Sequence, residues 1–276
     1  MKLFCGVVII YFANIGLVCA DVKTITSTSA ISIDMVLPYK LIPKDFASIY
    51  FGLPVKEFIE THKRVKPEDH LASLVAKYMD PEEAERQEQQ KTQYVYTYKE
   101  KIKSPVFGTA EYGFDVNMKL DRFAFYYVSI SAGRIIKHRR IVLKELVRLW
   151  GPPTKKQVFR EIGSMLKKPF WEAHLYWNFK NGQAKFLCPQ NVDWDWTRAK
   201  DPLLFTLGYG LGLRLSIMSV ENAKKSEQYL KTGPWKKWTF DADDPSLDAK
   251  EIRQVFKDIE LDKIIEEVKA EKSGRK

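Results

Sequence analysis

The chain has 276 residues, of which 45 % are hydrophobic and 13 % aromatic, and it carries a formal net charge of +10 with only 3 cysteines. This composition favours a globular body and excludes disorder of the whole chain. A chain of this length can bury a core that is large enough to fold without cross-links.

The first twenty residues predict an export signal. Lys2 gives a cationic start, Leu3 to Val18 form an apolar stretch, and Ala20 closes a cleavage site of small residues. The stretch is interrupted by Asn14 and falls short of the ~20 apolar residues of a stable membrane span. We therefore expect cleavage after Ala20 and an exported protein, either periplasmic or secreted. A retained anchor and a lipoprotein modified at Cys19 are the alternatives.

Cleavage would change the chemistry of the mature chain. Cys188 would be its only cysteine, so no intramolecular disulfide could form. The signal would take only Lys2 from the basic residues and leave a basic protein outside the cytoplasm. The expected partner is therefore an unknown acidic protein or an anionic envelope component, and not nucleic acid. No second long apolar run follows the signal, so we expect no transmembrane helix in the mature protein.

The first half of the body begins after a flexible lead rich in Ser and Thr, residues 21–30. Gly52-Leu53-Pro54 turns the chain into a short amphipathic helix. Apolar spacing predicts a helix over residues 67–78 and a helical or solvated segment over 82–90. It also predicts three strands, over residues 94–98, 108–118 and 122–131. Both faces of the strand at 122–131 are apolar, which indicates a central strand or one that is covered on both sides.

The second half begins with a basic helix from Lys137 to Trp150, which Gly151-Pro152-Pro153 ends. Asn181-Gly182 predicts a tight hairpin between two strands. A short helix is predicted over residues 159–166, and the two hairpin strands over 171–179 and 183–188. A last strand follows over 211–218, then a helix over 219–230 and one long amphipathic C-terminal helix over 247–272.

Strands in hairpins with helices in blocks favour an α+β fold built on an antiparallel sheet with packed helices. The domain is expected over residues 31–240, followed by a C-terminal amphipathic helix and tail at 241–276. Short helices and aromatic-rich strands accompany both Gly52-Leu53-Pro54 and Gly151-Pro152-Pro153. Two degenerate repeats, 31–132 and 133–240, are therefore one possible organisation of the domain.

Two segments carry a resemblance to known families. The segment FGLPVKEFIETHKRVK, residues 51–66, resembles the helix-opening stretch of small exported bacterial α/β modules such as the BamE/SmpA outer-membrane assembly lipoproteins and the beta-lactamase inhibitory proteins. The segment LKELVRLWGPPT, residues 143–154, is similar to a helix, Gly-x-Pro and strand pattern of secreted proteins of that shape. The resemblance implies a binding or assembly role without catalysis. This chain departs from it in lacking a lipidation signal and in having a longer body.

A cluster of basic residues on the helix at 137–150 is the best candidate interaction surface. Its members are Arg134, Lys137, Arg139, Arg140, Lys144 and Arg148, with His138, Lys155 and Lys156 beside them. Such a cluster is either an ordinary solvated helix face or a seat for an anionic surface or an acidic partner.

The segment Asp193-Trp194-Asp195-Trp196 crowds two carboxylates and two indoles into one loop. Paired acids with aromatic rings that stack on sugar are the equipment of a glycoside hydrolase. The alternative interpretation is a loop pinned by its tryptophans. A hydrolase that uses Asp193 and Asp195 is therefore one of the functions left open.

Other catalytic and metal-binding patterns are weak. The four histidines, His62, His70, His138 and His174, lack zinc-ligand spacing, and no nucleotide-binding or nucleophile-elbow motif occurs. Cys188 suits a small buried residue at a strand end better than a catalytic thiol. We expect no cofactor and no metal. The sequence thus favours an exported non-catalytic binding or assembly module, with a secreted factor that docks on anionic surfaces and a hydrolase as alternatives.

Overall fold

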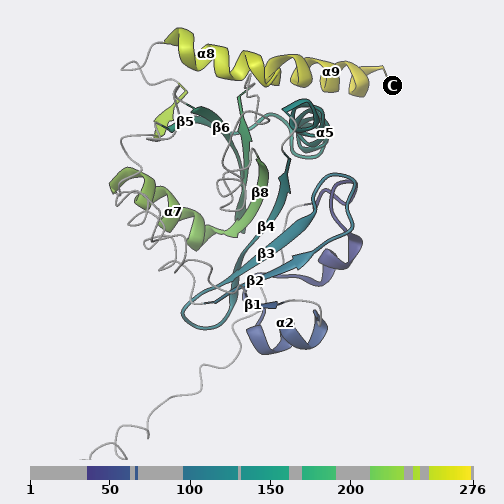
Figure 1. Cartoon of the computed structure of the whole chain (residues 1–276), viewed down its shortest axis with the longest axis vertical. Coiled ribbons are helices and arrows are strands. Elements are labelled where there is room, and N and C mark those ends of the chain that lie inside the picture. Colours follow the sequence, from purple (N-terminus) through teal and green to yellow (C-terminus); the bar gives the residue numbers. More distant parts are fainter. Residues whose placement is uncertain are drawn as a thin grey trace, which may run out of the picture. The chain divides into compact units, whose positions relative to one another are not determined.

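The computed structural model describes residues 36–62, 66–67, 96–129, 132–161, 170–190, 212–232, 239–242 and 249–274. The predicted signal and lead and the segment predicted over 82–90 lie outside these residues, as does the segment predicted over 67–78 except for Pro67, which lies in a strand. The described residues form an antiparallel sheet with packed helices (Figure 1), which confirms the α+β class. No helix among them is long and apolar enough to cross a membrane.

The described strands form one nine-stranded sheet in the order β1-β2-β3-β4-β8-β7-β6-β5-β9, with every pair antiparallel. In chain order the strands are β1 (Lys66–Pro67), β2 (Tyr96–Lys101), β3 (Thr109–Phe114), β4 (Leu120–Val128), β5 (Lys155–Glu161), β6 (Phe170–Phe179), β7 (Gly182–Pro189), β8 (Gly212–Ser219) and β9 (Thr239–Asp241).

The centre of the sheet is the β4/β8 pair, which joins a meander from the first half of the chain to one from the second. The central place predicted for the strand at 122–131 is therefore confirmed. The predicted last strand is β8, and it also lies at the centre because it pairs with both β4 and β7. The two halves of the chain thus contribute to one continuous sheet, and their description as degenerate repeats stays a prediction.

The two faces of the sheet differ in chemistry because side chains alternate along each strand. One face, here called the apolar face, is built from buried residues such as Tyr112, Phe125, Leu215, Phe186 and Trp177. The opposite face, here called the polar face, carries charged, hydroxyl and amide side chains. Their register aligns them in rows across the strands, and these rows matter for the site below.

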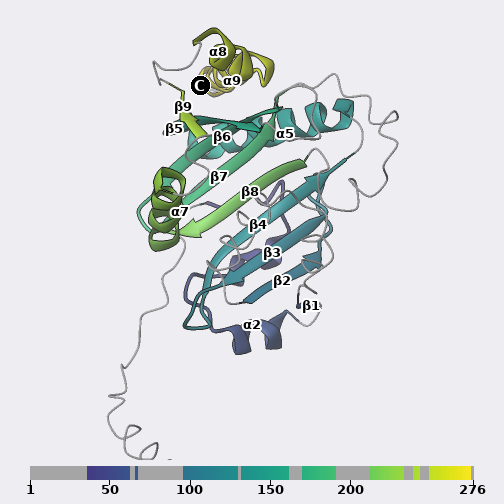
Figure 2. The same cartoon turned by 60° about the vertical axis from the view of Figure 1, so that its left-hand side comes forward.

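Helices lie on both faces (Figures 1 and 2). Helix α5 (Ala132–Trp150) packs on the apolar face, and its inward side chains belong to the core cluster. The 3-10 helix η1 (Lys44–Ser48) and α2 (Val55–Thr61) place Phe46 and Phe58 against Tyr112, with ring centroids 6.0 and 4.5 Å apart. Helix α7 (Val220–Thr232) follows β8 and lies on the other side of the sheet from α5.

The predicted stop of α5 is confirmed. Gly151 follows Trp150 with a φ of +78°, in the left-handed region that favours glycine, and its amide donates to the carbonyl of Val147. The carbonyl of Gly151 accepts a hydrogen bond of 2.9 Å from the indole of Trp177 in β6. The helix end is therefore tied to the sheet.

Two helix predictions are wrong. The short helix predicted from residue 159 is strand β5 up to Glu161, because Phe159 pairs with Glu172 on one side and Thr239 on the other. The single C-terminal helix is two helices, α8 (Ala249–Asp258) and α9 (Leu261–Ser273). They are separated at Glu260, whose φ of 56° is left-handed and breaks the helical hydrogen bonding.

The predicted β6–β7 hairpin is confirmed, but Gly182 does not occupy a loop position as the predicted turn required. Phe179 pairs with Gly182, so Lys180 and Asn181 occupy the two loop positions and neither has a positive φ. Gly182 is the first residue of β7, and a Cβ there would lie 2.7 Å from the carbonyl oxygen of Met218. The glycine permits the close approach of β8 and not a left-handed turn.

Candidate functional site

Helix α5 presents two adjacent stripes of basic residues that meet different surroundings. Arg140 and Lys144, here called the paired stripe, face α9. Arg134, Lys137 and Ile141, here called the exposed stripe, recur at intervals of three and four residues on the neighbouring face of the helix. Arg134, Lys137 and Ile141 are all exposed, and Ile141 is 43 % accessible.

The paired stripe is bound by acidic residues of the chain's own C-terminal helices. Arg140 forms ion pairs of 2.8 Å with Glu260 and 2.6 Å with Glu267, and Lys144 forms one of 2.6 Å with Glu271. All these side chains are about one-third exposed, and ion pairs of that kind contribute ~0.2–1 kcal/mol each. These ion pairs therefore contribute more to the orientation of α9 on α5 than to the free energy of unfolding.

Apolar burial holds α9 in place. Leu261, Ile264 and Val268 repeat at helical spacing and are 1 %, 0 % and 2 % exposed. They belong to the same core cluster as Val142 and Leu146 of α5. Complete burial of an aliphatic side chain contributes ~1.5–3 kcal/mol, so the apolar seam outweighs the ion pairs above it.

Arg139 differs from the rest of the basic cluster because it is buried, with 2 % of its surface exposed. Its guanidinium donates to the carbonyl oxygens of Pro189 at 2.7 Å and Asp258 at 2.8 Å. Burial lowers the pKa of Arg139, while Cys188 and Asp258 oppose that shift. Arg139 therefore links β7 to the end of α8 through buried hydrogen bonds.

The remaining members of the predicted cluster also have partners within the chain. Arg148 pairs with Glu145 one turn earlier on α5. Lys155 pairs with Glu227 of α7 at 3.2 Å and with Asp241 of β9 at 3.8 Å. Lys156 lies 5.5 Å from the ring centroid of Phe256 in α8. The structure thus places Arg134 and Lys137 at the exposed surface of α5, pairs Arg148 within the helix, and sets the other cations against neighbouring elements.

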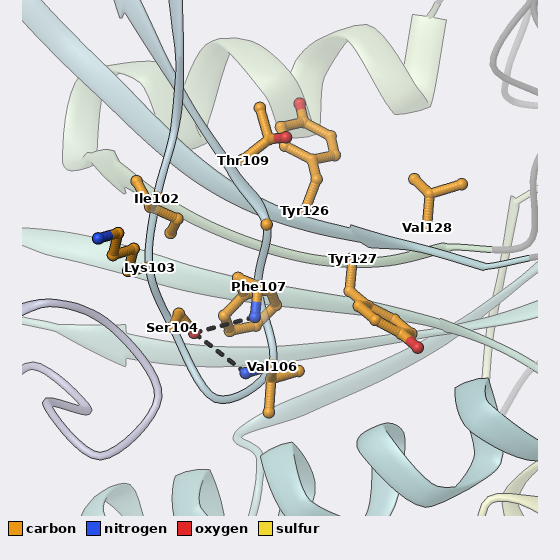
Figure 3. A pocket seen from close by; sticks show the side chains of 10 residues that line it. Ile102, Lys103, Ser104, Val106, Phe107, Thr109, Tyr126, Tyr127 and Val128 are labelled. Atoms are coloured by element: carbon orange, nitrogen blue, oxygen red, sulfur yellow. Dashed lines mark hydrogen bonds between the residues drawn. The ribbon is translucent and has the colours of Figure 1, made fainter. Parts of the chain in front are cut away.

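An open pocket of about 730 Å³ lies beside the exposed stripe, where the β2–β3 connection meets the end of β4 (Figure 3). Ser104 shapes the connection by accepting hydrogen bonds from the amides of Val106 and Phe107. Figure 3 shows Tyr126 and Tyr127 projecting to opposite sides of β4. The pocket lining combines aromatic and aliphatic side chains with the polar residues Lys103, Ser104 and Thr109.

His138 connects this pocket to α5. Its ring meets the ring of Tyr127 edge-on, with centroids 4.2 Å apart. Burial, then Lys137 and Arg134, lowers the pKa of His138, so the neutral form is favoured at neutral pH. The N-terminal half of α5 thus combines cations and a neutral histidine with an adjoining pocket of mixed polar and apolar lining.

The polar face of the sheet contains a second constellation, on β5, β6 and β7. The hydroxyl of Tyr176 donates to Gln157 at 2.7 Å, and the Nε2 of His174 lies 2.9 Å from a carboxylate oxygen of Glu172. Lys185 stands directly opposite Tyr176, with its ammonium 5.3 Å from the ring centroid. The predicted hairpin placed β6 beside β7, but residues from 159 onward were predicted as a helix, so the pairing of β5 with β6 and this constellation were not expected.

Burial shifts the proton affinities of this constellation. It lowers the pKa of His174 to about 4, with Lys185 adding to the effect, and it raises the pKa of Tyr176. It also lowers the pKa of Lys185 to about 8, although the charge of Glu172 opposes that shift. Perturbed pKa values of this kind are common at functional sites and in structural networks alike.

The remaining candidates from the sequence are the Trp-rich acidic loop, the catalytic thiol and a metal site. The segment Asp193-Trp194-Asp195-Trp196 and His70 lie outside the described residues. Cys188 is fully buried in β7, and burial raises its pKa to about 12, which disfavours the thiolate that nucleophilic catalysis needs. Within the described part of the chain, no three His, Cys, Asp or Glu side chains are grouped closely enough to hold a metal ion.

No protein-family model, curated protein or solved structure matches the chain. Its function has to be inferred from the arrangement of its own residues.

Proposed function

We propose that this protein is an exported, non-catalytic binding module that takes an acidic amphipathic helix of a partner protein on the exposed stripe of α5. The expected location is the periplasm or the exterior of the cell. Export rests on the cationic and apolar pattern of residues 1–20.

The observation that carries the proposal is the docking of α9 on the paired stripe. This neighbouring face of α5 combines cations with an apolar seam, and it binds a helix that presents Glu260, Glu267 and Glu271 above buried aliphatic residues. The exposed stripe also carries two cations and an aliphatic side chain, Ile141, on the same helix. A second acidic helix is thus the occupant whose chemistry complements this face.

The pocket beside Tyr127 adds to this argument. An isolated exposed isoleucine is ordinary at a protein surface, but Ile141 adjoins a face that continues through His138 and Tyr127 into the pocket. Val128, which also lines the pocket, is 53 % exposed. A partner helix on the exposed stripe could place one apolar side chain into this pocket.

The experiment compares capture of partners from the native envelope or secreted fraction by purified mature protein and its variants. The test variants are Lys137→Glu, which reverses the charge, and Ile141→Asp, which removes the apolar contact. Lys224→Glu on α7 and Val116→Asp in the β3–β4 turn are the matched controls, because both residues are exposed and lie on other elements. Mass measurement of the purified native protein locates its processed N-terminus.

The proposal expects a partner that both test variants lose and both controls keep, with its contact region mapping to an acidic amphipathic segment. Equal capture by test and control variants contradicts it. Binding to anionic lipid vesicles or acidic polysaccharide that Lys137→Glu abolishes and Ile141→Asp leaves intact would replace the partner helix with a charged surface. A native chain that starts at residue 1 would contradict the export part alone.

A further inference from the structure

Strand β3 begins too late in the chain to cover the end of β4. Its first residue, Thr109, is directly opposite Tyr126, and Val128 has a partner in β8 but none in β3. The pocket of about 730 Å³ lies at this uncovered edge, with the loop of residues 102–108 as its other wall (Figure 3). The pocket is therefore an opening at a strand edge and is lined from both faces of the sheet.

The backbone of Val128 supplies polar groups at this edge. The carbonyl of Tyr126 accepts a hydrogen bond of 2.9 Å from the amide of Gly108, so the backbone polar groups of Tyr126 face the β3 side. Backbone groups two residues apart along a strand point to the same side. The amide and carbonyl of Val128 therefore also face the β3 side, where β3 does not reach them.

The loop wall of the pocket is already formed. The hydroxyl of Ser104 donates to the carbonyl of Leu41, and it accepts hydrogen bonds of 3.1 and 2.9 Å from the amides of Val106 and Phe107. Phe107 is 1 % exposed and anchors the loop in the core. A Cβ at Gly108 would meet no atom within 4 Å, so the wall leaves open space there. A preformed wall of this kind loses little conformational freedom when a ligand binds.

Two half-buried tyrosines supply the aromatic surface of the pocket. The guanidinium of Arg214 lies 5.1 Å from the ring centroid of Tyr126, and the ring of His138 meets the ring of Tyr127 edge-on. Both tyrosine rings are thus positioned by contacts within the chain. A further ring can pair with them in an offset or edge-to-face arrangement, which an aliphatic side chain cannot do.

The charge of the lining favours a neutral ligand. None of the described residues that line the pocket is acidic, and Lys103 is the one lysine or arginine among them. Figure 3 shows the side chain of Lys103 pointing away from both tyrosines. Ser104, Thr109 and the backbone of Val128 still make part of the lining polar. A ring with an apolar body and one N–H or O–H group matches this combination.

We propose that this pocket binds the side chain of a tryptophan or tyrosine of the partner helix. The ring would lie beside Tyr127, and its N–H or O–H would donate to the carbonyl of Val128. The pocket volume lies within the ~300–1,000 Å³ of small-ligand sites, so an indole fits. This inference rests on the proposed function, since the helix on the exposed stripe of α5 carries the ring.

The first test is NMR titration of the full mature protein with N-acetyltryptophanamide and, in parallel, N-acetylleucinamide. The tryptophan probe is expected to shift the amide resonances of Gly108 and Val128 saturably and to bind about fivefold more tightly than the leucine probe. These two measurements use the wild-type protein and do not depend on the folding of a variant. Absence of saturable shifts, or equal binding of the two probes, overturns the proposal.

A matched pair of variants locates the probe. Val128→Trp places an indole of the chain itself at the pocket and should abolish the shift of Gly108. Val116→Trp is the control because Val116 is also an exposed valine, 75 % against 53 % for Val128, and does not line the pocket. It should leave the affinity for the probe within about twofold of wild type. Equal probe affinities in the two variants overturn the proposal.

Capture of the partner separates this inference from the proposed function. Val128→Trp and Lys137→Glu, of which the second does not line the pocket, should both lose the partner, and Val116→Trp should keep it. A partner that Val128→Trp keeps and Lys137→Glu loses overturns the aromatic anchor and supports the helix on the exposed stripe. A partner that Val128→Trp loses and Lys137→Glu keeps supports the pocket and contradicts docking on that stripe.

Discussion

Replacement of Arg139 should cost far more stability than replacement of its neighbour Arg140, although both belong to one basic sequence cluster. Arg139 is 2 % exposed and donates to two main-chain carbonyl oxygens, of Pro189 and Asp258. A hydrogen bond to a charged group contributes ~1.5–3 kcal/mol, so Arg139→Met should lower the free energy of unfolding by about 3 to 5 kcal/mol. Arg140 is 35 % exposed, and its two ion pairs predict a loss of about 1 kcal/mol in Arg140→Met.

The assay is urea unfolding followed by tryptophan fluorescence, with both variants measured beside the wild type. Arg139→Lys should recover less than half of the loss, because one ammonium cannot reproduce the planar fork that reaches both carbonyls. The reasoning fails if Arg139→Met and Arg140→Met are destabilised equally, or if Arg139→Lys is fully stable. The result also decides which variants can test partner binding, since a charge reversal at Arg139 would disturb the fold itself.

Two further predictions concern the sheet. Gly182→Ala should destabilise the protein by about 1–3 kcal/mol, because the new Cβ would lie 2.7 Å from the carbonyl oxygen of Met218. Gly108→Ala is the control, since a Cβ there meets nothing within 4 Å. Urea unfolding compares the two variants, and equal stabilities would refute the steric explanation. The pKa of His174 is about 4 when folded against 6.5 when unfolded, so the unfolded chain binds the proton first and stability should fall as pH drops from ~6.5 towards 4, by on the order of 3 kcal/mol. His174→Asn should flatten the stability slope between pH 6.5 and 5 relative to the wild type, and an unchanged slope in His174→Asn would contradict the assignment.

Local patterns predicted most of the elements that the structure describes. Aromatic alternation predicted β4 as a central strand, and Gly151-Pro152-Pro153 predicted where α5 ends. The break between α8 and α9 escaped prediction because the apolar spacing continues from Ile252 to Val268, and Glu260 is no typical residue for a left-handed position. Phe159 also misled the helix prediction, since its pairing with β6 and β9 depends on residues far away in the chain.

The candidate sites were predictable only in part, for the same physical reason. The basic cluster of α5 could be read from the sequence, but its division into a buried arginine, a paired stripe and an exposed stripe depends on where α9 packs. The position of Lys185 opposite Ser216 depends on the pairing of β7 with β8, two strands that a long connection separates. Charge in a sequence therefore indicates candidate surfaces, and long-range packing decides which charges remain available.

The most direct test of the central claim is site-specific photo-crosslinking from position 141 in the native host. Ile141 is replaced by a photoreactive phenylalanine analogue, and position 116, which is 75 % exposed in the β3–β4 turn, carries the same analogue as the control. The proposed function predicts a specific adduct from position 141 alone, whose crosslinked peptide maps to an acidic amphipathic helix of another protein. Identical adducts from both positions, or no adduct from position 141, would contradict it.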